Sequence, residues 1–148
     1  MYRHFILGAG LWLAAPTSMA SGADESLERF AADFRHAIAS HDGQGLAGMF
    51  VEPAGAWFSV EGTARGLRPD RYRTFTDFVA RTPRPLDERM DDMRIATDGE
   101  VGTVAFRYVF FVDGKATNHG METWQVVRTP GGWRIASMLY SVLPGAAP

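Results

Sequence analysis

The sequence contains no cysteine. This absence excludes disulfide bonds, thiolate metal sites, cysteine nucleophiles and a lipidated N-terminal cysteine. Lysine is nearly absent too, because Lys115 is the single lysine and arginine supplies the remaining fixed positive charges. The formal net charge is −2. Nucleic acids and anionic membranes attract proteins mainly through Lys and Arg, so we expect neither as a partner.

Long hydrophobic runs are also missing. The longest, residues 5–15, is shorter than the roughly 20 residues that a membrane-spanning helix needs. It follows a short basic start and precedes the small residues Ser18 and Ala20. This order is typical of a secretory signal peptide cleaved before Ser21, with an uncleaved anchor as the alternative. We therefore expect residues 1–20 to be removed and the protein to be exported, either periplasmic or secreted, with no membrane attachment.

The remaining residues, 21–148, have the length of one domain, and 46% hydrophobic content across the chain suffices for a single core. From Leu27 the apolar residues recur at the spacing of one helical face. This helix is predicted to end near Gly43, where a glycine can adopt the left-handed conformation. A short helix or turn is expected over 46–50, and a strand over 56–61.

A second sizeable helix is predicted to begin at Pro69, because proline is tolerated in the first helical turn. It should end before Pro83. Beyond it the hydrophobic period changes from helical spacing to alternation, and four strands are expected, separated by Asp-Gly and Pro-Gly-Gly turns. Their predicted ranges are 88–97, 101–112, 119–128 and 133–143. Helices followed by a meandering antiparallel sheet indicate an α+β fold.

The C-terminal part carries a family resemblance in the run from His119 to Ile135, above all in its Gly-Gly-Trp-Arg-Ile segment at 131–135. Together with the segment 61–66, this run resembles the nuclear transport factor 2-like superfamily, in its SnoaL-like branch, over about residues 25–143. The resemblance implies a single SnoaL-like domain at 21–148, with N-terminal helices packed on a strongly bent antiparallel sheet. The result is a cone with a pocket at its wide end.

Membership of that family would not choose an activity, because its members include isomerases, cyclases, dehydratases, ligand-binding proteins and association modules. The ketosteroid isomerase pattern uses an aspartate base, a tyrosine and a protonated aspartate around one pocket. These three residues do not map onto this sequence one by one. The resemblance therefore implies a fold and a pocket rather than a reaction.

Alternation on two strands predicts one apolar sheet face that includes Phe106, Tyr108 and Phe110 on one strand and Trp124 on the next. Glu122 shares the phase of Trp124. If this face lines the cone, Glu122 is a carboxyl group in an apolar row, and burial would raise its pKa and make it a catalytic candidate. The favoured alternative places Glu122 on the exposed face or beside Arg134.

Several other residues are candidates for the pocket. His119 begins its strand and could act as an acid or base at the rim, although a surface histidine beside a turn is commoner. Tyrosine hydroxyls could donate hydrogen bonds to a ligand or find ordinary backbone partners. The candidate ligand-binding residues are Tyr72, Phe106, Tyr108, Phe110, Trp124 and Tyr140.

No pattern predicts a metal or cofactor. His36 and His41 are five residues apart, whereas ligands on one helical face need a spacing of three or four. Asp91 and Asp92 are adjacent in a predicted strand, so their side chains should point to opposite faces. We expect neither pair to form a site, and we expect the protein to work without a cofactor.

The last strand is apolar on both faces, since Trp133, Ile135 and Leu139 alternate with Met138 and other apolar residues. A second apolar face suits a partner subunit, so a homodimer is expected. The sequence favours an exported domain that binds a small apolar or aromatic organic molecule in an apolar pocket. An isomerase, cyclase or dehydratase using Glu122 or His119 is the alternative, and a dimeric association module is a third.

Overall fold

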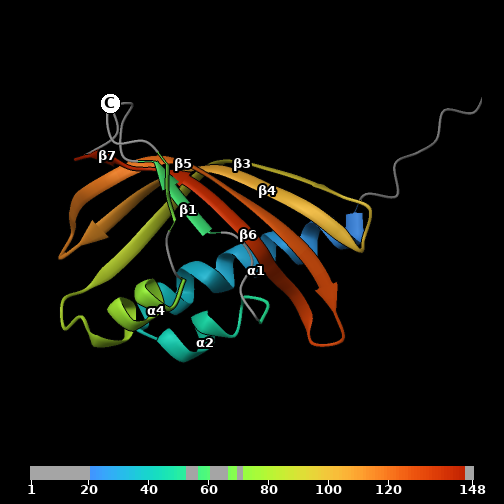
Figure 1. Cartoon of the computed structure of the whole chain (residues 1–148), viewed down its shortest axis with the longest axis horizontal. Helices are drawn as coiled ribbons and strands as arrows, with labels where there is room; N and C mark the ends of the chain where they lie inside the picture. The colour runs from blue at the N-terminus through green and yellow to red at the C-terminus, as the bar shows by residue number, and fades with distance from the viewer. Residues whose placement is uncertain (1–20, 53–56, 61–66, 70–71, 146–148) are drawn as a thin grey trace, which may run out of the picture.

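The computed structural model describes residues 21–52, 57–60, 67–69 and 72–145. Figure 1 shows the helices lying against one face of a curved sheet. The order in the sheet is β2-β1-β6-β5-β4-β3, with β7 paired to β5. Neighbouring strands are antiparallel except β1 and β6. The elements are α1 (Ser21–Ala39), α2 (Gly43–Ala47), β1 (Trp57–Val60), β2 (Leu67–Pro69), α4 (Tyr72–Arg81), β3 (Leu86–Thr97), β4 (Val101–Val112), β5 (Lys115–Thr129), β6 (Gly132–Ser141) and β7 (Leu143–Pro144).

The predicted α+β class and the meander of long strands are confirmed. β4 has the predicted bounds, and the turns before and after it contain Gly99 and Gly114 at positive φ, where a side chain would be strained. β5 begins at Lys115, four residues earlier than predicted, and pairs with β4 along nearly its whole length. The hairpins therefore follow the turn chemistry of the sequence.

The end of α1 differs from the prediction. The left-handed residue is His41, with φ of 59°, and not Gly43. Gly43 instead begins α2, at a place where any side chain would collide with the Thr76 carbonyl oxygen of α4. This glycine is required because the two helices approach closely. At His41 the backbone is strained, and the side chain makes a contact of its own: its Nδ1 lies 3.1 Å from the Val79 carbonyl oxygen.

Pro69 does not start a helix as predicted. It ends β2, where it pairs with Phe58 of β1, and α4 begins at Tyr72. Pro69 therefore occupies a strand end, another position where a missing N–H is tolerated. Within α4, Tyr72 and Val79 face the core and are buried. Phe78 stays 40% exposed.

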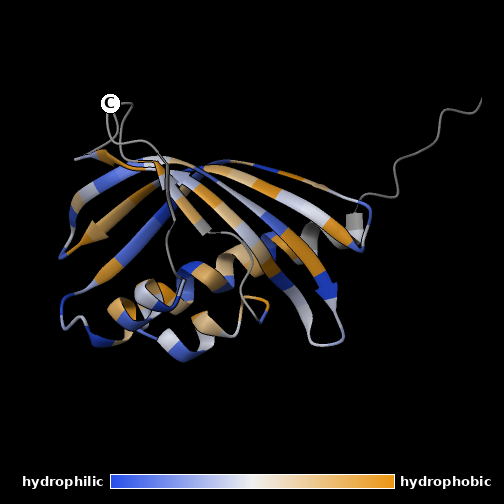
Figure 2. Ribbon diagram, viewed as in Figure 1, coloured by the Kyte–Doolittle hydropathy of each residue, from blue (hydrophilic) through white to orange (hydrophobic). Residues whose placement is uncertain are grey.

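The main core lies between α1 and the concave face of the sheet. Hydrophobic and hydrophilic residues alternate along the long strands in Figure 2, so that each strand has an inner and an outer face. On the inner face Trp124 is fully buried, with its ring centroid 4.7 Å from Phe34 of α1 and 5.0 Å from Phe106. These rings fill the middle of the cone.

A β-bulge in β6 changes which residues share a face. The register shifts between Gln125 and Val126 of β5, so that β6 gains one residue. Ile135 and Met138 are three apart, yet both are buried. The predicted simple alternation of β6 is therefore wrong, because an extra residue reverses the phase of everything that follows it. Leu139 is left 47% exposed.

The predicted signal peptide, residues 1–20, lies outside the described residues. Within the described part of the chain, no helix has the length and apolar content needed to cross a membrane.

Candidate functional site

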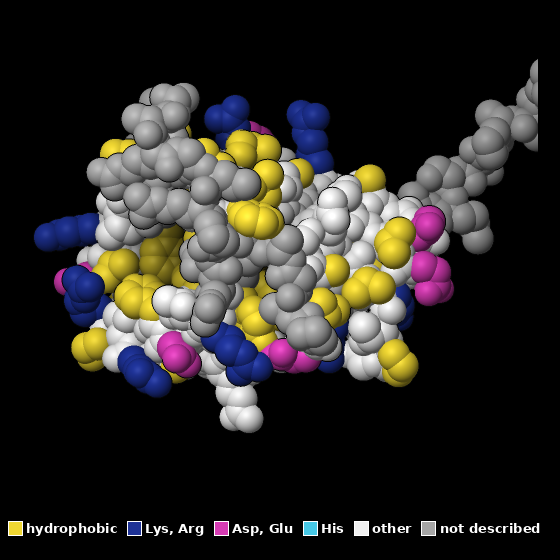
Figure 3. All heavy atoms as spheres, viewed as in Figure 1, with side chains coloured by type: hydrophobic (Ala, Val, Ile, Leu, Met, Phe, Trp, Pro, Cys, Tyr) yellow, Lys and Arg dark blue, Asp and Glu magenta, His cyan; other side chains and the backbone are white. Residues whose placement is uncertain are grey.

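A cavity of about 360 Å³ opens where α4 faces the inner side of the sheet. Its size lies within the usual range for small-molecule pockets. On the left of Figure 3, hydrophobic side chains line a hollow in the surface. The cavity is lined by Phe34, Phe75, Phe78, Glu88, Tyr108, Phe110, Val112, Thr117, Asn118, Glu122, Met138, Tyr140 and Val142.

Glu122 lies on the cavity wall and is only 5% exposed. It comes from the middle of β5, where its neighbours across the sheet are Phe106 and Tyr140. The indole Nε1 of Trp124 donates a hydrogen bond to Glu122 Oε1, with 2.5 Å between the two atoms. Burial raises the pKa of the Glu122 carboxyl to about 7, against the opposing effect of this hydrogen bond. The alternative that placed Glu122 on the exposed face is therefore wrong.

Arg134 does not approach Glu122 in the structure. Its guanidinium donates to the backbone oxygen of Trp133, 2.7 Å away. The register of the two strands explains this outcome, because Arg134 pairs with Val127, which lies further along β5 and on the opposite face from Glu122, whereas Tyr140 pairs with Glu122.

Glu88 is a second buried carboxyl on the same wall, and sequence reasoning missed it. Its side chain is 3% exposed, and its Oε2 has no hydrogen-bond partner among the described residues. Burial raises the pKa of Glu88 well above its ordinary value, and the charges of Glu122 and Asp87 raise it further. Alternation was the available signal, because Glu88 stands between Leu86 and Met90, which share its face.

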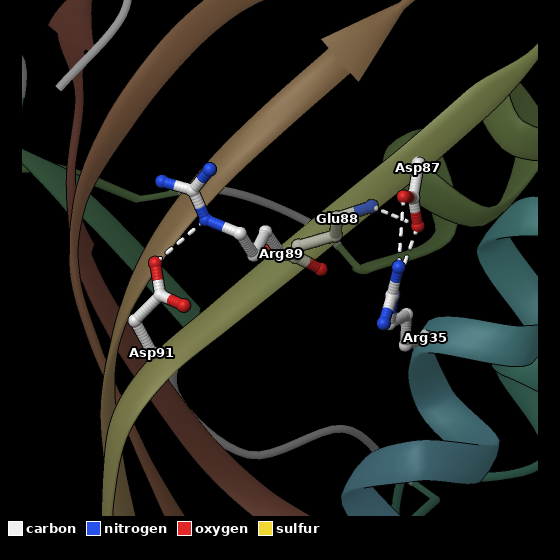
Figure 4. Close-up of polar contacts among 5 residues, drawn as sticks. All are labelled: Arg35, Asp87, Glu88, Arg89 and Asp91. Carbon is white, nitrogen blue, oxygen red and sulfur yellow. Dashed lines mark hydrogen bonds and ion pairs between the residues drawn. The ribbon is translucent and has the colours of Figure 1, made fainter.

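Asp87, the residue before Glu88, is bound by Arg35 of α1. Arg35 of α1 forms two hydrogen bonds with the Asp87 carboxylate, each 2.9 Å long. Asp87 also accepts a hydrogen bond of 2.9 Å from the backbone amide of Glu88 (Figure 4). The side chain of Glu88 takes no part in this contact. The Arg35 bond lowers the pKa of Asp87. The start of β3 is thereby attached to α1.

Two tyrosines also contribute to the polar part of the cavity, together with Thr117 and Asn118. Tyr108 donates a hydrogen bond from its hydroxyl to the Ser141 backbone oxygen, 2.8 Å away. Its ring lies edge-on to Tyr140, with 6.3 Å between centroids. Burial, followed by the charges of Glu122 and Glu88, raises the pKa of Tyr108 above its ordinary value. Tyr108 is therefore a neutral phenol whose donor is already engaged.

Four predicted site residues do not reach the cavity wall. Phe106 and Trp124 lie deeper, where their rings pack against each other in the filled core. Tyr72 donates its hydroxyl hydrogen to Glu52 and stacks on Phe50, 4.7 Å between centroids. Alternation predicts the face on which a residue lies, but it cannot tell the filled depth of the cone from its open end.

His119 is the fourth predicted site residue that does not reach the cavity wall. It is three residues from Glu122 on the same strand, and therefore faces the other side of the sheet. Its Nδ1 lies 3.1 Å from the Gly145 backbone oxygen. The structure thus brings together Glu122, Tyr108, Phe110 and Tyr140 from the predicted set, adds Glu88, and leaves His119 outside.

Metal ligands do not gather anywhere in the described part of the chain, where no three His, Cys, Asp or Glu residues stand close enough to hold an ion. Asp91 and Asp92 lie at a β-bulge, since the register with β4 shifts between Asp91 and Arg94. Their carboxylates take separate partners. Asp91 binds Arg89 at 2.7 Å, and Asp92 lies 3.5 Å from Arg107.

The sequence of residues 27–144 matches the model of a protein family described as the SnoaL-like domain. A search of curated proteins found no match. The family match covers the helices and strands that form the cavity wall.

Solved structures match the fold. A nuclear transport factor 2-like protein with a cystatin-like fold from Novosphingobium aromaticivorans is 19% identical, with a TM-score of 0.62, and the match covers 84% of each chain. A candidate dehydratase from Streptomyces avermitilis is 20% identical, with a TM-score of 0.64 over 83% of this chain and 96% of that one. A candidate scytalone dehydratase from Novosphingobium aromaticivorans is 15% identical, with a TM-score of 0.64 over 84% and 91%. At these identities the likeness shows the fold.

Proposed function

The chain belongs to the SnoaL-like domain family, and on that premise we propose that it binds a small organic molecule in the cavity and transfers a proton through Glu122. One observation carries the proposal: a carboxyl group 5% exposed lies on the wall of an otherwise largely apolar cavity. Such a group is costly to the fold, because burial disfavours its charged form. A carboxyl retained at that cost is a candidate for chemistry.

The pKa of Glu122, about 7, suits a group that must both accept and release a proton at neutral pH. The bond from Trp124 occupies Oε1 and leaves Oε2 to exchange the proton with the ligand. In the proposed step the carboxylate takes a proton from a C–H group of the ligand, whose electron pair remains in the ligand. The new carboxylic acid then returns the proton to another ligand atom in an isomerisation or cyclisation, or to a departing hydroxyl in a dehydration.

Binding without turnover is the second candidate. The observation that favours it is Tyr108, whose hydroxyl hydrogen is engaged by Ser141 and so does not serve as a donor to the ligand. The association module is less well supported, because a cavity of about 360 Å³ remains at the open end of the cone.

Deuterium exchange tests the proton transfer even while the product is unidentified. Small molecules that copurify with the native protein are identified by mass spectrometry and incubated with fresh protein in D₂O. We expect the wild type to catalyse deuterium incorporation at a carbon atom and Glu122→Gln to lose this activity. Glu100→Gln makes the same chemical change at an exposed turn residue and should behave as wild type. Binding without incorporation by the wild type would favour the second candidate.

We also propose that the protein is exported and that residues 21–148 are the mature domain. The basic start, apolar run and small-residue exit of residues 1–20 support this. Cleavage before Ser21 would leave α1 whole, because this helix begins at Ser21. N-terminal sequencing of exported material should begin at or near Ser21, and an intact Met1 would contradict the proposal.

A homodimer through the outer face of the sheet is proposed as well. Met121 is 48% exposed and Leu139 47%, and both lie on strands in the middle of the sheet. Exposed apolar residues gathered on one face favour an interface. Light scattering should report twice the chain mass, and Leu139→Asp should shift it to one chain mass. A wild-type protein that remains monomeric at high micromolar concentration would contradict this.

A further inference from the structure

The described part of the cavity wall carries acidic groups without a basic one. Two buried carboxyl groups, Glu88 and Glu122, lie on its wall, and no Lys, Arg or His is among the described residues that line it. Among the described residues the cation whose charge acts on Glu88 is Arg35, and it is committed to Asp87 through two hydrogen bonds. A buried carboxylate is normally paired with a cation or hydrogen-bonded on its free oxygens. Here Glu88 Oε2 has neither within the described structure.

Most of the large side chains on the remaining wall are aromatic, beside Val112, Met138, Val142 and the polar Thr117 and Asn118. Phe75 and Phe78 come from α4, and the ring of Phe110 lies within 6.4 Å of both, centroid to centroid. Tyr108 and Tyr140 stand on the cavity wall beside the carboxyls. Aromatic faces attract organic cations, and the attraction grows when the site excludes water. The carboxyl groups and the aromatic rings of the wall therefore both favour a positively charged ligand group.

We propose that the ligand of this cavity is a small organic amine, bound as its ammonium ion, with an apolar or aromatic body. The ammonium group donates hydrogen bonds to Glu88 Oε2, and the body lies against Phe75, Phe78 and Phe110. This inference rests on the proposed function only in taking the cavity as the ligand site. Glu122 remains the proton-transfer group, and Glu88 is the specificity-determining one.

Other ligand charges fit the cavity less well. A carboxylate ligand would add a third acidic group to a site without a cation. An uncharged alcohol donates one hydrogen bond and cannot compensate the charge of an ionised carboxyl. An ammonium group supplies up to three donors and a full positive charge, which satisfies the free oxygen of Glu88 and offsets the repulsion between Glu88 and Glu122.

Binding of a cation should be linked to proton release. The ionisable groups that face Glu88 are Arg35 from α1, Asp87 on its own strand, Tyr108 from β4 and Glu122 from β5, while Tyr140 of β6 faces Tyr108. The residues of α4 on the wall carry no charge. A bound ammonium group favours the charged forms of both carboxyls, so a proton leaves the pair as the amine enters.

The test compares 2-phenylethylamine with the neutral 2-phenylethanol, which has nearly the same shape. Isothermal titration calorimetry near pH 7 and near pH 8, in two buffers of different ionisation enthalpy, gives both affinity and proton release. We expect the amine to bind about tenfold or more tightly than the alcohol, the scale of a desolvated cation–π contact, and only the amine to release protons.

Glu88→Gln keeps the shape and removes the charge. It should abolish the amine preference by weakening amine binding far more than alcohol binding, whereas Glu100→Gln should keep the preference. Equal binding of both probes by the wild type would overturn the amine assignment while leaving the proposed ligand cavity intact. Full amine preference in Glu88→Gln would also overturn it. Failure of both probes to bind would count against the amine assignment and against the cavity as a ligand site.

Discussion

Acidic residues on the two faces of β3 differ in their exposure to solvent and in their pairing with cations. On the outer face, Asp87 and Asp91 each bind an arginine at 2.9 Å or less, and their side chains are 41% and 46% exposed. On the inner face, one residue away from Asp87, Glu88 is 3% exposed and has a free oxygen. The carboxylates on the outer face are thus paired with cations although water already solvates them. The buried carboxyl of Glu88 has no cation partner, although burial makes an unpaired charge more costly there.

We propose that this difference separates structural from functional charge. The outer pairs cost little to form and contribute little, because water screens both partners. An inner carboxyl without a counter-ion weakens the fold, and a hydrophobic residue of similar size would be more stable there. We therefore propose that Glu88 and Glu122 serve the ligand of the cavity, and the following measurements test that contrast.

The largest expected effect is on the pH dependence of stability. The pKa of Glu122 is about 7 in the folded protein, against an ordinary value of 4.5. Because the folded state then binds more protons between these values, the free energy of unfolding falls as the pH rises from about 4.5 to above 7. Glu122→Gln should remove this loss and be more stable than wild type near pH 8 by about 3 kcal/mol.

Urea unfolding at a series of pH values measures this effect. The two proteins should have similar stability near pH 4, where the carboxyl is protonated in both states, and should diverge above it. Parallel curves over the whole range would mean that Glu122 keeps an ordinary pKa in the folded protein. Asp87→Asn should not reproduce the gain, since the Arg35 bond lowers the pKa of Asp87 rather than raising it.

The proton-transfer rate should distinguish the roles of the two inner carboxyls, Glu122 and Glu88. Glu122→Gln should slow proton transfer by about 10²-fold or more, the scale on which general acid–base groups act, while the same change at Glu88 alters ligand affinity. The rate of deuterium incorporation at saturating ligand measures this division. A 10²-fold loss of that rate in Glu88→Gln would assign the proton-transfer role to Glu88.

The smallest effect is expected on the outer face. A double-mutant cycle on Arg35 and Asp87 should give a coupling energy below about 1 kcal/mol, because both side chains are roughly half exposed. The coupling should shrink further in high salt. A larger, salt-insensitive value would show that this pair holds β3 to α1 more strongly than its exposure suggests.

Much of the fold could be predicted from local patterns. The bounds of strand β4 agree with the prediction at both ends, because alternation and two turn glycines define this strand without reference to anything distant. Phe110 and Tyr108 lie on the predicted inner face for the same reason. Pro69 was wrongly predicted to begin a helix, because proline is tolerated both in a first helical turn and at the end of a strand. Only the pairing with Phe58 shows that Pro69 ends a strand.

The candidate site could be predicted only in part. Glu122 is a candidate from sequence because it shares a face with Trp124. Its burial does not follow from sequence, since Arg134 is a reasonable partner until the register of β5 and β6 is known, which places Arg134 opposite Val127 and Tyr140 opposite Glu122. Glu88 is hidden among interleaved charges at the start of its strand. For His119 the sequence left a rim position and a commoner surface position open, and its three-residue separation from Glu122 places it on the other face of β5.

The amino-acid sequence by itself determined the α+β class, the order of the longer helices and strands and the face on which most strand residues lie, because helical and strand periods are properties of consecutive residues. Only the tertiary structure decided that the rings of Phe106 and Trp124 fill the cone while those of Phe75 and Phe110 border a cavity. It also decided that Glu88 and Glu122, from strands separated by β4, share that cavity. Proximity of distant residues follows from sheet curvature, bulges and helix packing, which no local period encodes.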